Sequence, residues 1–97
     1  MNAYVIANID VTNPDGYEDY KGRAAASIAM HGGRYIARGG KTEVLDGDVE
    51  PKRIALIEFP DMATARRWYS SAEYQAALPL RLQNSIGSAV LVEGMPD

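Results

Sequence analysis

The sequence contains no cysteine and a single histidine, His31, among its 97 residues. The absence of cysteine excludes disulfides, thiolate nucleophiles and iron–sulfur clusters, and it leaves no thiolate ligand for zinc. With one histidine, a metal site would depend almost entirely on carboxylates. We therefore predict no metal and no other cofactor, and any enzymatic chemistry is expected to be proton transfer or an oxidation driven by the substrate itself.

The chain also lacks a strong charge bias and a long apolar run. Its net charge is −3 and its basic residues are scattered, whereas nucleic-acid binding needs clustered Lys and Arg. The N-terminal segment MNAYVIANID has no basic residue and reaches Asp10 too early for a signal peptide or a membrane span. We expect no nucleic-acid or membrane partner, and the cytoplasm is the expected compartment.

Hydrophobic periodicity, together with the positions of proline and glycine, divides the chain into six elements. The predicted order is a strand over 4–11, a helix from Pro14 to Gly32-Gly33, a strand over 34–38 that resumes over 41–45, a strand over 53–59, a helical region from 62, and a strand over 88–93. Ser70 and Glu73 have the spacing of a capping box, so the second helix is expected to break there. Pro79 is expected to kink or end its second part.

The order β-α-β-β-α-β predicts one α+β domain over residues 1–97, a ferredoxin-like plait. Both helices of such a plait cover one face of a four-stranded antiparallel sheet, and the other face has no cover within the chain. A bare, partly apolar sheet face is commonly packed against a second copy. We therefore predict a homodimer in which two sheets face each other as a dimeric α/β barrel.

The tetrapeptide GGKT at residues 39–42 suggests a phosphate-binding loop, but its surroundings do not fit one. Such a loop needs an earlier glycine at a fixed spacing and a helix directly after the lysine. At that spacing this sequence has Tyr35, and a strand pattern follows the lysine. Gly39 and Gly40 are instead expected to form a β-bulge, or to mark a close approach by a ligand or another backbone.

Several stretches resemble the bacterial family known as domain of unknown function 1330. In chain order they are Gly32-Gly33-Arg34-Tyr35, Ala37-Arg38-Gly39-Gly40, Leu45-Asp46-Gly47, Ile57-Glu58-Phe59-Pro60, Ala65 with Trp68-Tyr69, Ser71-x-Glu73-Tyr74-Gln75, and Arg81. The chain departs from the family at Ala72, where proline is common. The resemblance implies a ferredoxin-like fold in the dimeric α/β-barrel superfamily, and it implies no particular reaction.

A looser similarity is to the antibiotic biosynthesis monooxygenases of the same superfamily. These enzymes oxidise polycyclic phenols without a metal or a flavin, and they place a Trp and a Tyr near the substrate. The similarity implies comparable positions for Trp68 and Tyr74, at the level of fold and residue type.

Arg38 and Glu58 are the candidate catalytic pair. If the hairpin between them turns near Asp48, they lie at similar distances from the turn and face each other on neighbouring strands. The pair would then orient a carboxylate or enol substrate, with Glu58 as the base. A structural cross-strand ion pair is the alternative interpretation.

Other candidates also have two interpretations. Trp68, Tyr69 and Tyr74 form either an aromatic wall for a flat ligand or part of the core. His31 is either a general base or a partner of the helix C-terminus. Arg81 either binds an anion at the pocket mouth or pairs with an acidic residue such as Glu73 or Asp97.

We expect the Gly39-Gly40 break, Glu58 and the aromatic residues to converge on one pocket, unless strand alternation turns Glu58 to the opposite sheet face. Three functions fit this expectation. The first is a small-molecule-binding protein or cofactor-free enzyme that acts on a small metabolite. The second is a ligand sensor or accessory subunit without turnover, and the third is a dimer whose glycines and ion pair are purely architectural.

Overall fold

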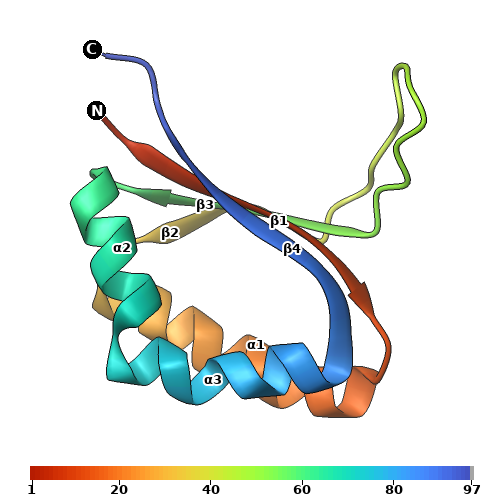
Figure 1. The fold of residues 1–97 in the computed structure, drawn as a ribbon, viewed down its shortest axis with the longest axis horizontal. Helices are drawn as coiled ribbons and strands as arrows, with labels where there is room; N and C mark the ends of the chain where they lie inside the picture. Colours follow the sequence, from red (N-terminus) through yellow and green to blue (C-terminus); the bar gives the residue numbers. More distant parts are fainter. Residues whose placement is uncertain (97) are drawn as a thin grey trace.

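The computed structural model describes residues 1–96, which form a four-stranded sheet covered on one face by helices (Figure 1). The elements are β1 (Ala3–Val11), α1 (Pro14–Met30), β2 (Arg34–Arg38), β3 (Arg53–Phe59), α2 (Met62–Ser70), α3 (Ala72–Asn84) and β4 (Ser85–Glu93). The strands lie in the order β2-β3-β1-β4 and every pair is antiparallel. This order confirms the ferredoxin-like βαββαβ plait. Within residues 1–96, no helix is long and apolar enough to cross a membrane.

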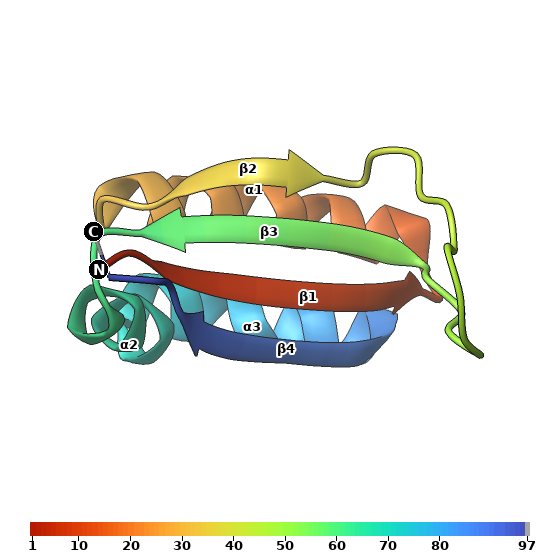
Figure 2. The same ribbon diagram turned by 90° about the horizontal axis from the view of Figure 1, so that it is seen from above.

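The sheet has two different faces because side chains alternate along each strand. On β1, Ala3, Val5, Ala7 and Ile9 are buried and point toward the helices. The intervening residues point to the other side, which we call the open face. Figure 2, which looks onto this face, shows α1 and α3 lying behind the sheet.

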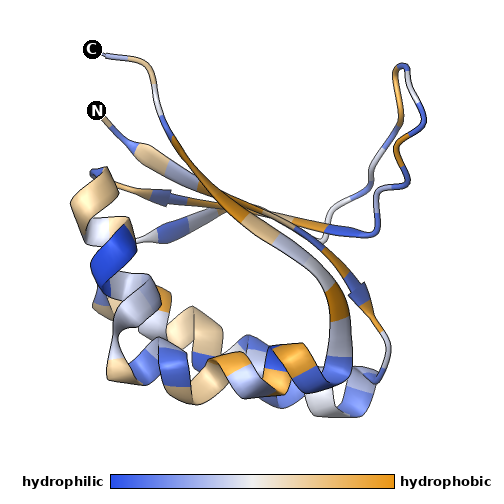
Figure 3. Cartoon of the chain, in the orientation of Figure 1, coloured by the Kyte–Doolittle hydropathy of each residue, from blue (hydrophilic) through white to orange (hydrophobic). Residues whose placement is uncertain are grey.

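The open face carries exposed apolar side chains. Ile6 is 42% exposed, Val92 44% and Ile86 70%, although all three lie within strands. Figure 3 shows hydrophobic residues along β3 and β4 as well as in the helices.

Both ends of α1 and the start of α2 lie at the predicted places. Pro14 is the first residue of α1, where its missing N–H costs no hydrogen bond. At the other end, the Gly33 amide donates to the Ile28 carbonyl (2.9 Å) and Gly32 has φ of 78°, which is a Schellman motif. Asp61 caps α2 by accepting a hydrogen bond from the Thr64 amide at 2.7 Å.

The break between α2 and α3 lies one residue later than predicted. Ser71, not Ser70, caps α3, and its hydroxyl accepts the Tyr74 amide at 3.2 Å. The Ser70 hydroxyl instead donates to the Arg66 carbonyl within α2 (2.8 Å), so Ser70 remains helical. Pro79, predicted to kink or end the helix, does not end it, because α3 continues past Pro79 to Asn84.

The predicted continuation of the second strand over 41–45 is also wrong, because β2 ends at Arg38 and residues 39–52 form a loop. The Gly39 amide makes the last bond to β3, donating to the Ile54 carbonyl at 2.8 Å. Gly39 has φ of 65°, which turns the chain out of the sheet. Beyond this point the segment has no neighbouring strand, and Figure 1 shows it extending away from the helices.

The strand β4 begins at Ser85 rather than at the predicted Ser88. Its first residues pair with the end of β1, where Ile86 lies opposite Asp10 and Ser85 opposite Val11. This pairing explains why strand structure begins directly after α3 despite the glycine at position 87.

Candidate functional site

A cavity of about 370 Å³ lies between the helix-facing side of the sheet and the helices. Its aromatic wall consists of Tyr17, Tyr20, Tyr35, Trp68, Tyr69 and Tyr74. Five cationic side chains also line it, namely Lys21, Arg38, Arg53, Arg66 and Arg81. None of the Asp, Glu and His residues in the described part of the chain lines this cavity.

A β-bulge in β2 places Arg38 at the cavity. Tyr35 lies opposite Ile57 and Arg38 lies opposite Ala55, with the register shift between Tyr35 and Ala37. In a regular strand, residues 35 and 38 would point to opposite faces. The additional residue, Ile36, puts both on the helix-facing side, and the Arg38 guanidinium carbon lies 4.6 Å from the Tyr35 ring centroid. The bulge is therefore at Ile36, not at the predicted Gly39-Gly40.

The predicted pairing of Arg38 with Glu58 is wrong. Glu58 lies opposite Arg34 in the register, and the Arg34 Nε lies 2.9 Å from the Glu58 Oε1 on the open face. The prediction assumed a turn near Asp48 that divides the connection equally. Instead, Ala55 is the residue opposite Arg38, because the register of β2 and β3 next to the loop is centred between residues 46 and 47 and not at Asp48. The Arg34 side chain is 71% exposed, so the bridge contributes little stability.

Glu58 consequently lies outside the cavity. It points to the open face opposite Tyr4, whereas its neighbours Ile57 and Phe59 are buried toward the helices. The expected convergence of Glu58 with the aromatic residues is therefore wrong, and the alternative of strand alternation is correct.

Two tyrosines and an arginine form a partly buried polar group in the cavity. The hydroxyl oxygens of Tyr20 on α1 and Tyr74 on α3 lie 3.0 Å apart, within hydrogen-bond distance. Burial raises the pKa of both phenols above the usual value, and the positive charge of Arg81 opposes this rise at each of them. Both phenols are therefore protonated at neutral pH. One of them donates to the other, and the second keeps its O–H to donate to an acceptor in the cavity.

Trp68 forms both core and cavity wall. It is 3% exposed, and its ring lies 4.2 Å from the Tyr74 ring and 5.3 Å from the Phe59 ring, centroid to centroid. Its Nε1 donates to the Ser27 hydroxyl at 3.0 Å, and that hydroxyl donates to the Ala24 carbonyl at 2.8 Å. The indole N–H is thus already satisfied, so Trp68 offers a ligand only its apolar surface.

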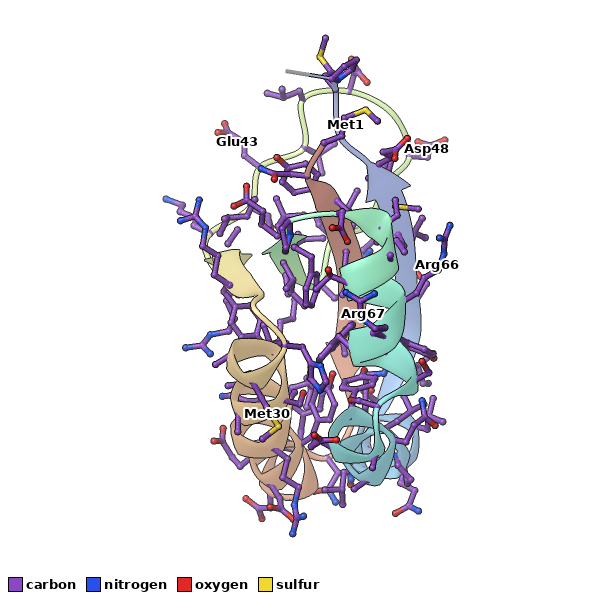
Figure 4. All side chains as sticks on the ribbon, turned by 90° about the vertical axis from the view of Figure 1, so that its left-hand side faces the viewer. Met1, Met30, Glu43, Asp48, Arg66 and Arg67 are labelled. Carbon is purple, nitrogen blue, oxygen red and sulfur yellow. The ribbon has the colours of Figure 1, made fainter. Side chains whose placement is uncertain are left out.

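Tyr69 and Arg66 lie at the outer part of the cavity. Tyr69 is 43% exposed and its ring lies 5.4 Å from that of Tyr74. Figure 4 shows the neighbouring residues Arg66 and Arg67 projecting from α2 in different directions. Arg66 lines the cavity, whereas Arg67 donates to the Thr64 hydroxyl at 3.0 Å and does not line it.

The remaining candidates do not line the cavity. His31 is the C-cap residue of α1, as one interpretation predicted, and its Nε2 lies 3.6 Å from the Glu73 Oε1. Glu73 forms no ion pair with Arg81 in the described residues, and Asp97 lies outside them. Gly39 and Gly40 do not line the cavity. A side chain at Gly39 would occupy the place of the Arg53 guanidinium, and nothing lies within 4 Å of a methyl group added at Gly40.

Sequence reasoning missed Lys21, Tyr35, Arg53 and Arg66 as cavity residues. The position of Arg53 could have been predicted, because it lies an even number of residues from the buried Ile57 and Phe59 and therefore on the same side of β3. The positions of Tyr35 and Arg66 could not, since each depends on tertiary packing. In residues 1–96 no three His, Cys, Asp or Glu side chains are grouped closely enough to hold a metal ion.

Several solved structures are similar to this chain. A protein of unknown function from Rhodopseudomonas palustris has 14% identity and a TM-score of 0.78, covering 99% of this chain and 84% of its own. SnoaB from Streptomyces nogalater, a cofactor-independent oxygenase, has 15% identity and a TM-score of 0.69, covering 99% and 95%. A dimeric ferredoxin-like protein of unknown function from Thermobifida fusca has 18% identity and a TM-score of 0.66, covering 96% and 91%. At these identities the similarity establishes the fold.

No curated protein matches the sequence. The family model described as Domain of unknown function (DUF1330) matches residues 2–95, which agrees with the motifs noted in the sequence. The chain therefore belongs to this family.

Proposed function

We propose that this protein binds a small organic metabolite in the cavity between the sheet and the helices and acts on it without a metal or a flavin. The supporting observation is the cavity itself. Its volume of about 370 Å³ lies within the usual range for small-molecule sites, and aromatic walls with a few polar groups are typical of them. The similarity to SnoaB in fold is compatible with cofactor-free chemistry.

The residues favour electrostatic catalysis over a general base. Glu58 and His31, the two predicted bases, do not line the cavity, whereas Arg38 and Arg81 do. Fixed positive charges lower the free energy of an anion that forms beside them. A bound phenol or enol would therefore lose its proton to water more readily. The resulting anion is electron-rich, and in an oxidation it would supply the electrons that dioxygen accepts.

A ligand sensor or accessory protein without turnover is the alternative, and it requires the same cavity. The two functions differ only in what happens to the bound molecule. If a ligand co-purifies, incubation with the protein in air followed by mass spectrometry distinguishes them, because only an enzyme changes the mass of the ligand.

The cavity-binding proposal predicts that a small molecule co-purifies with the protein. Native mass spectrometry is expected to show an additional mass that disappears under denaturing conditions. Ala55→Leu should abolish it, because Ala55 lines the cavity and the larger side chain would occupy its volume. Ala63→Leu, an exposed position on α2 outside the cavity, is the matched control and should retain the ligand. Equal retention by both variants would contradict the proposal.

We also propose that two copies pair through their open faces as a homodimer. Similar structures are described as dimeric, and the open face exposes Ile6, Ile86 and Val92 without a cover from the chain. A contiguous apolar face of this kind is usually buried by a partner.

The dimer proposal predicts twice the chain mass in sedimentation equilibrium at micromolar concentration. Val92→Asp should give a monomer, because a charge would be buried between the two sheets. Leu82→Asp, at a residue 63% exposed on α3, should leave the dimer intact. A monomeric wild-type protein at these concentrations would be inconsistent with the proposal.

A further inference from the structure

The cavity contains an excess of positive charge that residues 1–96 do not neutralise. Of its five cationic side chains, only Lys21 forms an ion pair within these residues, with Glu18 at 2.8 Å. None of the four arginines lies within ion-pair distance of a carboxylate in residues 1–96. A bound anion is the simplest group that would balance these charges.

Arg81 distinguishes this arrangement from a set of solvated surface arginines. Its side chain is only partly exposed, and its Nε is buried with no hydrogen-bond partner among residues 1–96. An unpaired donor on a buried charged group is costly, and it stays in a folded protein when something compensates for it. Arg38 and Arg66, by contrast, are exposed and already in contact with water.

The surroundings of Arg81 fit an oxyanion. Arg81 lines the same cavity as Tyr20 and Tyr74, whose hydroxyl oxygens are 3.0 Å apart. A guanidinium and a protonated phenol in one cavity offer several hydrogen-bond donors to the oxygen atoms of a bound anion. Guanidinium groups bind carboxylates and other oxyanions with good geometry. The aromatic rings around this point offer flat apolar surface, which suits a planar ring on the ligand.

From these contacts we infer that the cavity takes an aromatic organic anion, a carboxylate or a phenolate, and that Arg81 binds its charged oxygen with the help of the Tyr20–Tyr74 pair. This inference rests on the proposed function and adds the charge of the ligand and the residue that anchors it. Arg38, over the Tyr35 ring at 4.6 Å, and Arg53 contribute positive potential from the opposite wall.

Isothermal titration calorimetry with two probes of one shape tests the inference. 2-Naphthoate carries a carboxylate, and 2-naphthamide replaces it by a neutral amide. The wild-type protein, freed of co-purified ligand, is expected to bind the naphthoate at least about tenfold more tightly, because an ionic hydrogen bond to a guanidinium is stronger than a neutral one. 4-Nitrophenolate compared with 4-nitroanisole at pH 8.5 repeats the test for a phenolate and shows which of the two anions is preferred.

Variants assign the effect to Arg81. Arg81→Gln is expected to weaken naphthoate binding about tenfold or more and to leave naphthamide binding unchanged, and Arg81→Lys should retain part of the preference. Arg67→Gln, which removes an equal charge outside the cavity, should behave as wild type. Circular dichroism melting verifies that each variant is folded, and the wild-type comparison of charged and neutral probes stands even if Arg81→Gln does not fold.

The outcomes separate this inference from the proposed function. Equal binding of the charged and neutral probes, or equal weakening of both by Arg81→Gln, would overturn the inference and leave the cavity as a small-molecule site. Absence of binding by all four probes at millimolar concentration would overturn the inference, and retention of a co-purified ligand would still support the proposed function.

Discussion

Trp68→Ala is expected to lower the free energy of unfolding by about 3–5 kcal/mol, the range for removal of a buried Trp or Phe side chain. Trp68 is 3% exposed and packs against Phe59 and Tyr74, and it joins α2 to α1 through its hydrogen bond to Ser27. A domain of this size has a total stability of about 5–15 kcal/mol, so the loss would be a large part of it. Urea unfolding followed by far-ultraviolet circular dichroism measures the change.

The matched control for this change is Tyr69→Ala, the adjacent aromatic residue of the same cavity wall. Tyr69 is 43% exposed, so its removal should cost much less than that of Trp68. Trp68→Phe should give an intermediate loss, because the ring is kept and the Ser27 hydroxyl still has Ala24 as a partner. Equal losses for the Trp68 and Tyr69 alanine variants would show that Trp68 is not a core residue.

Gly87→Ala is the second change for which we expect a large effect, a loss of about 3 kcal/mol, near the upper end for overpacking. Gly87 on β4 lies opposite Ile9 on β1, and an added methyl group would collide with the Asn8 carbonyl oxygen and lie 2.9 Å from the Ile9 Cα. Both are backbone atoms, so no rotamer change relieves the contact. Figure 1 shows β4 curving strongly after it leaves α3, and the glycine allows the two strands to lie close along this curve.

Gly22→Ala makes the same chemical change at a position with free space. Gly22 is exposed on α1, and nothing lies within 4 Å of an added methyl group. The change is expected to stabilise the protein by about 0.5–1 kcal/mol, because alanine has the higher helix propensity. The urea unfolding of both variants is measured at two protein concentrations, because a contribution of dimer formation to stability would depend on concentration. A Gly87→Ala variant as stable as wild type would mean that β1 and β4 separate easily at this point.

Much of the secondary structure follows from residues that are close together in the chain. The alternation in β1, Pro14 at the start of α1 and Gly32-Gly33 at its end each act over a few residues, so they are readable without the fold. The order of the elements then leaves few topologies, which is why the ferredoxin-like plait was predictable. The absence of cysteine likewise excluded whole classes of chemistry.

The composition of the cavity, in contrast, depends on strand register and packing. Ile36 favours a strand and gives no local sign of a bulge, yet the bulge turns Arg38 toward the helices and leaves Glu58 opposite Arg34. A shift of one residue reverses the face of every side chain beyond it, so pairing across a long loop cannot be read from spacing alone.

The Tyr20–Tyr74 pair with Arg81 shows the same limit over a longer distance. The two tyrosines are 54 residues apart and lie on different helices, α1 and α3, which the fold brings side by side. The sequence by itself determined that aromatic and cationic residues recur along these helices. Only the tertiary structure decided that they surround one cavity that no carboxylate of residues 1–96 lines, because that depends on how distant segments pack together.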